Sequence, residues 1–260
     1  MIQLENSAAP RARIALLDEL RGFAVLCMVV RHAFFLIGYM FDYPWAQRAF
    51  DFFEPVSPFF AGTFVVISGI CAQLSRSNLR RGAKLMAVAL GITLVTWLVV
   101  PEELIRFGVL HMLASCMLIY GAVRRAFDRV PAGWGLLGCA VLFVLTAGLF
   151  FSARPYIGVP GVPQLQLTML GRWGRWLFPL GVRDAGFTSA DYYPIFPWLF
   201  AFLAGTVWGR RAAAGRFAAW TYPNRVPAFS FLGRHALLIF VLHQPVLYGI
   251  MLLLRALGIA

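Results

Sequence analysis

Long apolar runs separated by short polar segments are the dominant pattern of this chain. A helix that crosses a bilayer needs roughly 20 mostly apolar residues. Because the lipid interior offers the backbone no hydrogen-bonding partner, such runs predict helices rather than strands. Seven runs qualify, so we predict an all-α integral membrane protein whose helices form one bundle. The predicted spans are residues 16–41, 56–74, 85–100, 104–123, 134–152, 193–209 and 236–257.

The composition supports this fold class and excludes others. Hydrophobic residues make up 60% of the 260 positions and charged residues 13%, and the mean hydropathy is +0.74. Intrinsic disorder is excluded, because disorder requires low hydrophobicity. The formal net charge is +12, but the basic residues are scattered between apolar runs. Binding to nucleic acid would instead gather them on one soluble face. The expected partner is therefore the lipid bilayer and not nucleic acid.

The loops between the predicted helices alternate in charge. Those at 11–13, 76–84, 124–129 and 210–225 together hold 13 basic residues, whereas the opposite loops hold seven acidic and seven basic ones. The positive-inside rule then places the N-terminus in the cytoplasm and the C-terminus outside. We expect one domain over residues 1–260, in which residues 1–13 form a short cytoplasmic tail with no cleavable signal peptide.

The longest predicted loop, residues 153–192, lies on the outer side. Its first part is rich in proline and glycine. Residues 165–180 mix tryptophan with arginine, which is typical of a helix lying on the membrane surface. We therefore expect an interfacial helix in this loop.

The four cysteines each lie inside an apolar run, and none forms a C-x-x-C pair. This pattern favours a packing role over a disulfide framework or a zinc site. The sequence also contains no His-x-x-x-His or Glu-x-x-His spacing. We therefore expect no metal site.

Ionisable residues inside a membrane are costly and are candidates for function. In the first predicted helix, Asp18, Arg21 and His32 fall on one face at 3.6 residues per turn. Asp18 and Arg21 have the i, i+3 spacing of an ion pair, and His32 lies about 21 Å further along the axis. Either the pair only fixes the helix start, or the whole polar stripe is functional. His32 is correspondingly a core histidine or a catalytic one. Arg31 points away from the stripe, either to the membrane surface or toward an acid of another helix.

Three other positions add polar chemistry near the predicted outer half of the bundle. His111 lies near the start of the fourth predicted span, and Asp191 precedes the sixth. His243 lies within the last span and is followed by Gln244 and Pro245. Proline removes a backbone donor, which frees a carbonyl near His243. A histidine and carboxylate cluster is therefore expected there.

Four motifs carry a resemblance to a known family. Residues 17–32 read Leu-Asp-x-Leu-Arg-Gly-x-Ala-x-x-x-Met-Val-x-x-His. The Phe-Gly-x-Leu-His motif at 107–111, the Asp-Tyr-Tyr-Pro-x-x-Pro-Trp motif at 191–198, and a helix that ends in His-Gln-Pro at 233–245 follow in order. The chain resembles the bacterial membrane family related to heparan-alpha-glucosaminide N-acetyltransferase. A similar first helix also occurs in integral-membrane acyltransferases that O-acylate surface polysaccharides.

The resemblance implies transfer of an acyl group, typically acetyl from acetyl-CoA, to a sugar amine or hydroxyl across the bacterial inner membrane. The lysosomal enzyme to which this bacterial family is related has asparagine at the position of His32. It also has a histidine in the loop after its first helix. Residues 38–54 here contain no histidine, so the catalytic histidine of that relative has no matching position.

Three functions remain open at this point. In the first, an acyltransferase uses His32 as base or transient acyl carrier, His111 or His243 assists, and Asp191 orients. The CoA phosphates are then held by the basic loop of Arg76, Arg80, Arg81 and Lys84, which otherwise only determines topology. The second is a transporter or flippase for a polar or lipid-linked solute, and the third is a non-enzymatic accessory subunit. A glycan or glycolipid acceptor is expected for the first, and the sequence leaves a homodimer open.

Overall fold

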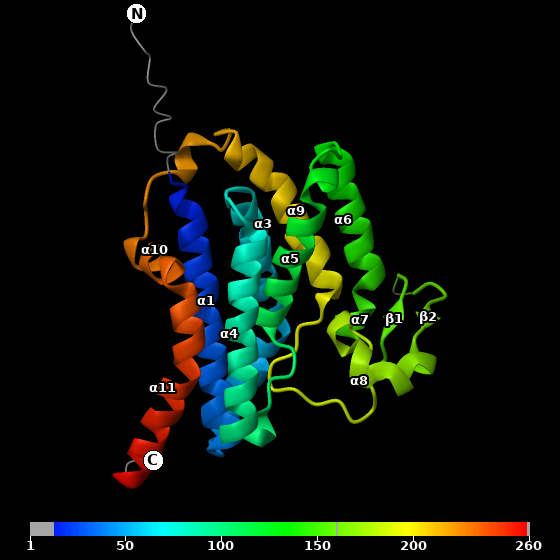
Figure 1. Ribbon diagram of the computed structural model, residues 1–260. Helices are drawn as coiled ribbons and strands as arrows, with labels where there is room; N and C mark the ends of the chain where they lie inside the picture. The colour runs from blue at the N-terminus through cyan, green and yellow to red at the C-terminus, as the bar shows by residue number, and fades with distance from the viewer. Residues whose placement is uncertain (1–12, 160, 259–260) are drawn as a thin grey trace, which may run out of the picture. The chain divides into compact units, whose positions relative to one another are not determined.

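The computed structural model describes residues 13–159 and 161–258, and these fold almost entirely into helices (Figure 1). The long helices are α1 (Ala15–Phe35), α3 (Ser57–Gln73), α4 (Asn78–Val99), α5 (Val109–Phe127), α6 (Ala132–Thr146), α9 (Ile195–Ala213) and α11 (Ala236–Ala256). A π-helical turn, η1 (Leu36–Met40), extends α1. The shorter helices are α2 (Pro44–Phe53), α7 (Gly148–Phe151), α8 (Gly174–Leu177) and α10 (Pro227–Arg234). The 3-10 turns are η2 (Glu54–Val56), η3 (Pro101–Glu103), η4 (Thr168–Trp173), η5 (Phe178–Leu180) and η6 (Ala219–Thr221).

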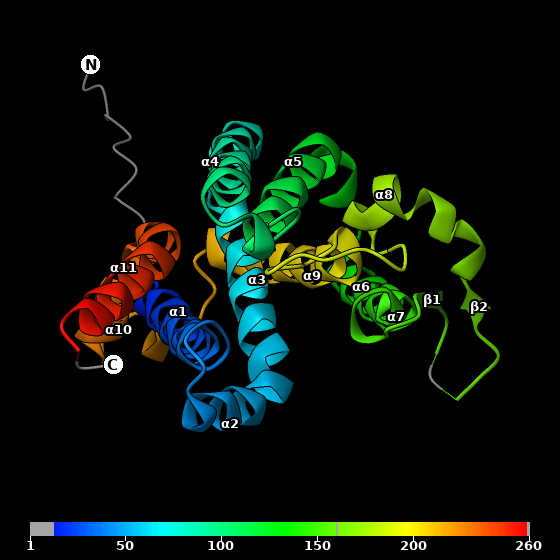
Figure 2. The ribbon, with the colours of Figure 1, turned by 90° about the horizontal axis from the view of Figure 1, so that it is seen from below.

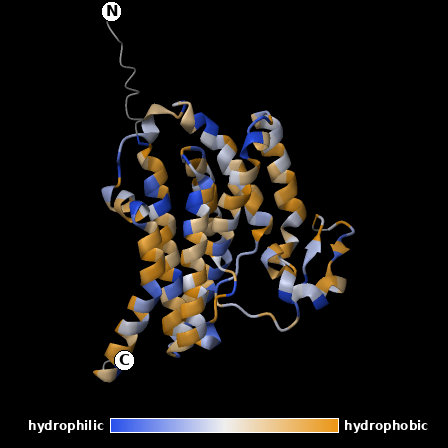
Figure 3. Cartoon of the chain, viewed as in Figure 1, coloured by the Kyte–Doolittle hydropathy of each residue, from blue (hydrophilic) through white to orange (hydrophobic). Residues whose placement is uncertain are grey.

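Five helical segments of the described chain are long and apolar enough to cross a membrane (Figure 3). These segments are Ala15–Met40, Pro44–Gln73, Asn78–Val99, Ala132–Phe151 and Ala236–Ala256. The prediction of an all-α integral membrane protein is thus confirmed. The helices α5 and α9 also form where spans were predicted, with 19 residues each, but each carries two arginines in its last turn. The count of seven spans therefore stays a prediction.

Two predicted boundaries and one predicted element differ from the structure. The third helix begins at Asn78 rather than at residue 85, and the Ser77 hydroxyl caps it. The fourth helix begins at Val109 rather than at residue 104, because Phe107 forms a β-bridge with Tyr192 and keeps the preceding segment extended. The connection between α7 and α9 contains no continuous helix over residues 165–180. A two-stranded hairpin of β1 (Tyr156–Ile157) and β2 (Leu165–Gln166) precedes three short turns, η4, α8 and η5. Gly174, the first residue of α8, lies against the backbone of Asp184, and a side chain there would collide.

The chain forms two compact units, one of Met1–Phe60 with Ala214–Ala260 and the other of Ala61–Ala213. Within the first unit, α10 and α11 lie along α1 (Figures 1 and 2). Within the second, α4 packs along α5 and α6 along α9. The expectation of a single domain stays a prediction.

Glycines set the closest helix contact in the first unit. A Cβ on Gly22 of α1 would collide with the carbonyl oxygen of Phe229 in α10, and a Cβ on Gly233 of α10 would collide with that of Asp18. Only residues without a side chain allow this approach. The glycine of the first-helix motif is therefore a packing residue, and its partner is the glycine that opens the His-Gln-Pro motif.

The second unit repeats this arrangement with other residues. Gly205 and Gly209 of α9 face the backbone carbonyls of Val66 and Ile70, and Gly69 of α3 faces that of Phe202. The Gly-x-x-x-Gly sequence of α9 is thus a helix-packing motif. Aromatic residues such as Trp198, 2% exposed, complete the core beside it.

All four cysteines are free. Cys116 and Cys139 are buried, and Cys27 and Cys71 are half-buried. This agrees with the packing role predicted for them.

Candidate functional site: a histidine pair between α1 and α11

The first unit brings His32 of α1 and His243 of α11 into direct contact. Nδ1 of His32 lies 2.8 Å from Nε2 of His243. The two ring centroids are 5.0 Å apart and the ring planes differ by 16°. His243 is buried, with 7% of its surface exposed. Of the two assistants predicted for His32, His243 is the one that this unit places in contact with it.

The backbone of α11 determines which nitrogens of the pair carry hydrogen. Nδ1 of His243 lies 2.8 Å from the carbonyl oxygen of Phe240 and 3.1 Å from that of Ile239. A carbonyl oxygen only accepts hydrogen bonds, so Nδ1 of His243 carries the hydrogen. In the neutral ring Nε2 is then an acceptor. His32 must donate to it from Nδ1, which leaves Nε2 of His32 with a lone pair. The pair is thus arranged to make His32 a base.

Pro245 follows this contact by two residues, in the interior of α11. Its ring provides no N–H and pushes against the carbonyl four residues earlier, which loosens the helix next to His243. Gln244, the residue between His243 and Pro245, is half-buried. The His-Gln-Pro motif therefore places a locally weakened helix at the histidine pair.

The other polar residues of the stripe act at the start of α1. Arg21 Nη1 lies 3.5 Å from Asp18 Oδ1, which confirms the i, i+3 ion pair. Arg13 Nε also donates to Asp18, at 2.5 Å. Arg31 meets an acid, since Nε donates to Glu54 at 2.7 Å. These contacts fix the two ends of α1.

Glu19 makes a structural contact that the sequence analysis did not predict. Its side chain is buried, and Oε1 accepts hydrogen bonds from the backbone N–H groups of Arg225 at 2.6 Å and Val226 at 3.0 Å. Val226 is the N-cap residue of α10. Glu19 thus joins the start of α1 to the start of α10, next to the contact between Gly22 and Gly233.

His111 and Asp191 belong to the second unit. Nδ1 of His111 accepts from the N–H of Gly108 at 3.3 Å. Nε2 lies 3.2 Å from Oγ1 of Thr93, which in turn donates to the carbonyl of Ile105 at 2.7 Å. One ring nitrogen of His111 therefore binds the turn before α5, and the other binds Thr93 of α4. Asp191 Oδ2 accepts from the N–H of Val109 at 2.9 Å and caps the same helix.

Tyr192, the residue after Asp191, holds the same segment through contacts with Phe178 and Arg183. Its hydroxyl donates to the carbonyl of Phe178 at 2.7 Å, and Arg183 lies over its ring at 5.3 Å. Burial raises the pKa of the Tyr192 phenol, and the nearby Arg183 charge opposes this only in part. The phenol therefore stays protonated and keeps its role as a donor.

A second polar cluster surrounds Asp128 at the end of α5. Its carboxylate accepts from Gln73 at 2.9 Å, Tyr120 at 3.1 Å and Arg124 at 3.3 Å, and Arg210 Nε lies 3.7 Å away. These partners come from α3, α5 and α9. The cluster joins the ends of three helices, and no sequence pattern had pointed to it.

Of the four basic residues predicted to form a loop, only Arg76 lies between α3 and α4, and Arg80, Arg81 and Lys84 lie in the first two turns of α4. Arg76, Arg80, Arg81 and Lys84 all face solvent, and the Ser77 hydroxyl accepts from the Arg80 N–H at 3.3 Å, which caps α4. A helix N-terminus favours anions, since its first N–H groups have no partner within the helix. These residues can therefore hold phosphate groups.

Helices long and apolar enough to cross a membrane, together with a histidine pair that leaves one ring nitrogen able to accept a proton, define an integral-membrane protein with a polar group within its helices. The family described as heparan-alpha-glucosaminide N-acetyltransferase, catalytic, matches residues 13–245. The chain belongs to this family of membrane acetyltransferases. Comparison with curated proteins and with solved structures gives no match. The matched region begins just before the Asp18 pair and ends at Pro245, so it includes both histidines of the pair.

Proposed function

We propose that the chain transfers an acetyl group from acetyl-CoA to an amine or hydroxyl of a sugar, with Nε2 of His32 as the general base. The observation that carries this proposal is the contact between His32 and His243. Two backbone carbonyls of α11 hold the hydrogen of His243 on its Nδ1, so that its Nε2 accepts from His32. A neutral imidazole with an available nitrogen suits a base at physiological pH.

In the proposed reaction, Nε2 of His32 removes a proton as the acceptor nitrogen or oxygen attacks the thioester carbonyl. The C–S bond then breaks, and the CoA sulfur leaves with the proton that His32 had received. While His32 is protonated, its Nδ1–H remains bonded to His243. His243 thus spreads the positive charge over two rings and holds the His32 ring in one orientation. A transient acetyl group on the same Nε2 is the variant of this mechanism in which His32 is the nucleophile.

The exposed residues Arg76, Arg80, Arg81 and Lys84 form the proposed site for the CoA phosphates, because guanidinium groups bind phosphate through paired, charge-assisted hydrogen bonds. We propose accordingly that these residues face the cytoplasm, where the donor is made, in a bacterial inner membrane. The acceptor then lies outside. Seven spanning helices, with α5 and α9 among them, give this orientation.

His111 and Asp191 receive no role in proton transfer in this proposal. Their bonds to Gly108, Thr93 and Val109 support a structural role at the start of α5. This role differs from the assisting and orienting roles first expected of them.

The test uses protein reconstituted in liposomes with radiolabelled acetyl-CoA and hexosamine acceptors. His32→Ala should lower the rate of label transfer at least 100-fold, the lower end of what a general base contributes. His235→Ala is the matched control. His235 is the N-cap residue of α11, its side chain is exposed, and among the contacts described its ring nitrogens bond only to the carbonyl of Phe231. Its rate should equal that of the wild type.

Three further variants distinguish the roles of the base and its partner. His243→Gln keeps an acceptor for the Nδ1–H of His32 and should lose less activity than His243→Ala. His32→Asn, which introduces the residue of the lysosomal relative, should be as inactive as His32→Ala. Full activity of His32→Asn would remove His32 as the base. Solute uptake by wild-type liposomes without any label transfer would instead identify a transporter.

A further inference from the structure

The connection between α7 and α9 carries an exposed apolar surface that the proposed function does not use. We call residues 152–159 and 161–180 the lateral segment, which contains the β1–β2 hairpin, η4, α8 and η5. Its most exposed apolar side chains are Met169 at 87%, Trp176 at 68% and Leu165 at 65%. The segment contains no helix long enough to cross a membrane. Apolar side chains gathered in this way mark a surface that meets a partner.

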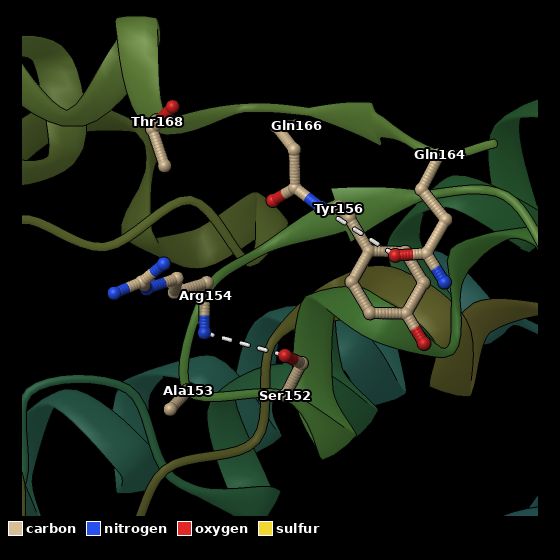
Figure 4. A pocket seen from close by; sticks show the side chains of 7 residues that line it. All are labelled: Ser152, Ala153, Arg154, Tyr156, Gln164, Gln166 and Thr168. Atoms are coloured by element: carbon tan, nitrogen blue, oxygen red, sulfur yellow. Dashed lines mark hydrogen bonds between the residues drawn. The ribbon is translucent and has the colours of Figure 1, made fainter. Parts of the chain in front are cut away.

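The hairpin separates its apolar and polar side chains onto opposite faces. Ile157 and Leu165 form a cross-strand pair, so their side chains share one face. Tyr156 and Gln166 form the next pair, and they take the other face because successive residues of a strand alternate. On that face they line an open polar depression together with Arg154 (Figure 4). One face of the hairpin thus suits water and the other an apolar partner.

The lateral segment is basic as well as apolar. It contains Arg154, Arg172 and Arg175 and no acidic residue. The Arg172 guanidinium lies 5.8 Å from the centre of the Trp173 ring, and the Arg175 guanidinium lies 5.8 Å from that of Trp176. All four of these side chains are exposed. Tryptophan beside arginine suits the membrane interface, where the ring lies at the headgroup level and the cation reaches phosphate.

The lateral segment also begins where a spanning helix ends. The apolar segment Ala132–Phe151 has 20 residues, which gives it a length of about 30 Å, the thickness of the hydrocarbon core. The lateral segment starts at the next residue and lies beyond α6 and α7, on the side away from α3 and α4 (Figures 1 and 2). A segment that leaves the end of a spanning helix sideways meets the surface of the bilayer.

Contacts with neighbouring elements hold the lateral segment in place. The N–H of Gly158 donates to the carbonyl of Leu145 in α6 at 2.9 Å. At the other end, the Tyr192 hydroxyl donates to the carbonyl of Phe178 at 2.7 Å. The exposed apolar face is therefore a fixed feature of the second unit.

We propose that the lateral segment docks on a bilayer leaflet that contains anionic phospholipid. Leu165, Met169 and Trp176 then lie among the upper acyl chains, and Arg172 and Arg175 bind the phosphates. A second copy of the chain fits this surface less well. A two-fold contact would bring the same arginines of both copies together without an acid to neutralise them. The docking does not depend on acetyl transfer.

The depth of the hairpin is measured at two adjacent residues of β2. Leu165→Cys and Gln166→Cys, each in a cysteine-free full-length chain, are labelled with nitrobenzoxadiazole and reconstituted in nanodiscs of phosphatidylcholine and phosphatidylglycerol. The probe at 165 should lie about 5–10 Å below the phosphates, as interfacial apolar side chains do, and doxyl-labelled lipid should quench it. The probe at 166 should be quenched by aqueous iodide instead. The same quenching at both positions overturns the proposal. Protection of the probe at 165 from both quenchers also overturns it, because protein would then cover this face.

The preference for anionic lipid is measured with the same probe at Leu165→Cys. Doxyl-labelled phosphatidylglycerol should quench it at an at least about fivefold lower mole fraction than doxyl-labelled phosphatidylcholine, since a basic residue at an anionic surface contributes about 1 kcal/mol. Arg172→Gln combined with Arg175→Gln should make the two lipids equivalent. The matched control combines Arg125→Gln with Arg129→Gln, an equal loss of two exposed arginines outside the lateral segment, and should keep the preference. Equal quenching by both lipids in the parent chain overturns the proposal, as does a preference that survives without Arg172 and Arg175.

The unmodified chain provides an independent measurement that requires no substitution. Phosphatidylglycerol with a photoactivatable diazirine near its headgroup should crosslink to peptides from residues 161–180, as identified by mass spectrometry. Crosslinks confined to the long helices would overturn the proposal, whether or not the labelled variants fold.

Discussion

Replacing Glu19 should destabilise the first unit by a predictable amount. In Glu19→Ala the backbone N–H groups of Arg225 and Val226 lose an ionised acceptor that lies 2.6 and 3.0 Å away. A hydrogen bond to a charged group contributes about 1.5–3 kcal/mol. Because Arg225 and Val226 are exposed, water replaces part of this loss, and we expect a net loss of about 2–4 kcal/mol for the two bonds. Glu19→Gln keeps a neutral acceptor and should lose about half as much.

The assay is thermal unfolding of the detergent-purified protein, followed by circular dichroism at 222 nm. At about 2–4 °C per kcal/mol for a chain of this size, Glu19→Ala should lower the Tm by about 4–16 °C. Glu102→Ala is the matched control, because Glu102 is an exposed acid of the turn η3, and its Tm should stay within about 1 °C of the wild type. Equal Tm values for Glu19→Ala and Glu102→Ala would refute the claim that Glu19 joins α1 to α10.

Further substitutions test the helix packing, the binding of the donor and the membrane orientation. Gly233→Ala should destabilise the protein by about 1–3 kcal/mol, since its new methyl group collides with the backbone of α1. Gly249→Ala in α11, where a Cβ meets nothing within 4 Å, should leave the Tm unchanged or raise it. Changing Arg80 and Arg81 together to Gln should raise the KM for acetyl-CoA severalfold at constant Tm, because both side chains are exposed, and an unchanged KM would leave them only their topological role. In a cysteine-free background, single cysteines at Arg80 and Gly161 should react with a membrane-impermeant maleimide from opposite sides, and labelling of both from one side would exclude the proposed orientation.

The helices could be predicted from the sequence because, in a bilayer, a spanning segment must form its backbone hydrogen bonds within itself. Any apolar run of sufficient length must satisfy its own backbone, so all seven predicted segments contain helices. The exceptions have tertiary causes. The start of α5 depends on the bridge between Phe107 and Tyr192, which are far apart in the sequence. The β1–β2 hairpin is built from strands of two residues each, too short to give a periodic pattern.

The candidate site could be predicted only in part. His32 was recognisable because an ionisable residue inside an apolar run is costly without a partner or a use. Its contact with His243 was one of two alternatives, and composition could not choose between them. Glu19 gave no signal, because its partners are backbone N–H groups 206 and 207 positions away. Because any residue except proline provides a backbone N–H, the sequence does not reveal which residues make such a contact.

Arg124 and Arg210, the two arginines around Asp128, have different roles during membrane insertion and in the folded protein. In the proposed orientation, Arg124 and Arg210 are separate hydrated cations while the helices are being inserted one after another, and each would hold its end of a helix on the cytoplasmic side. Once α5 and α9 have assembled, Arg124 and Arg210 share the Asp128 carboxylate, and Arg210 also donates to the carbonyls of Phe127 and Val130. In the proposed orientation, the same arginines that direct insertion then hold the ends of α5 and α9 together in the folded protein. Substitutions at these positions should therefore affect first the fraction of chains that insert correctly, and only then the stability of those that do.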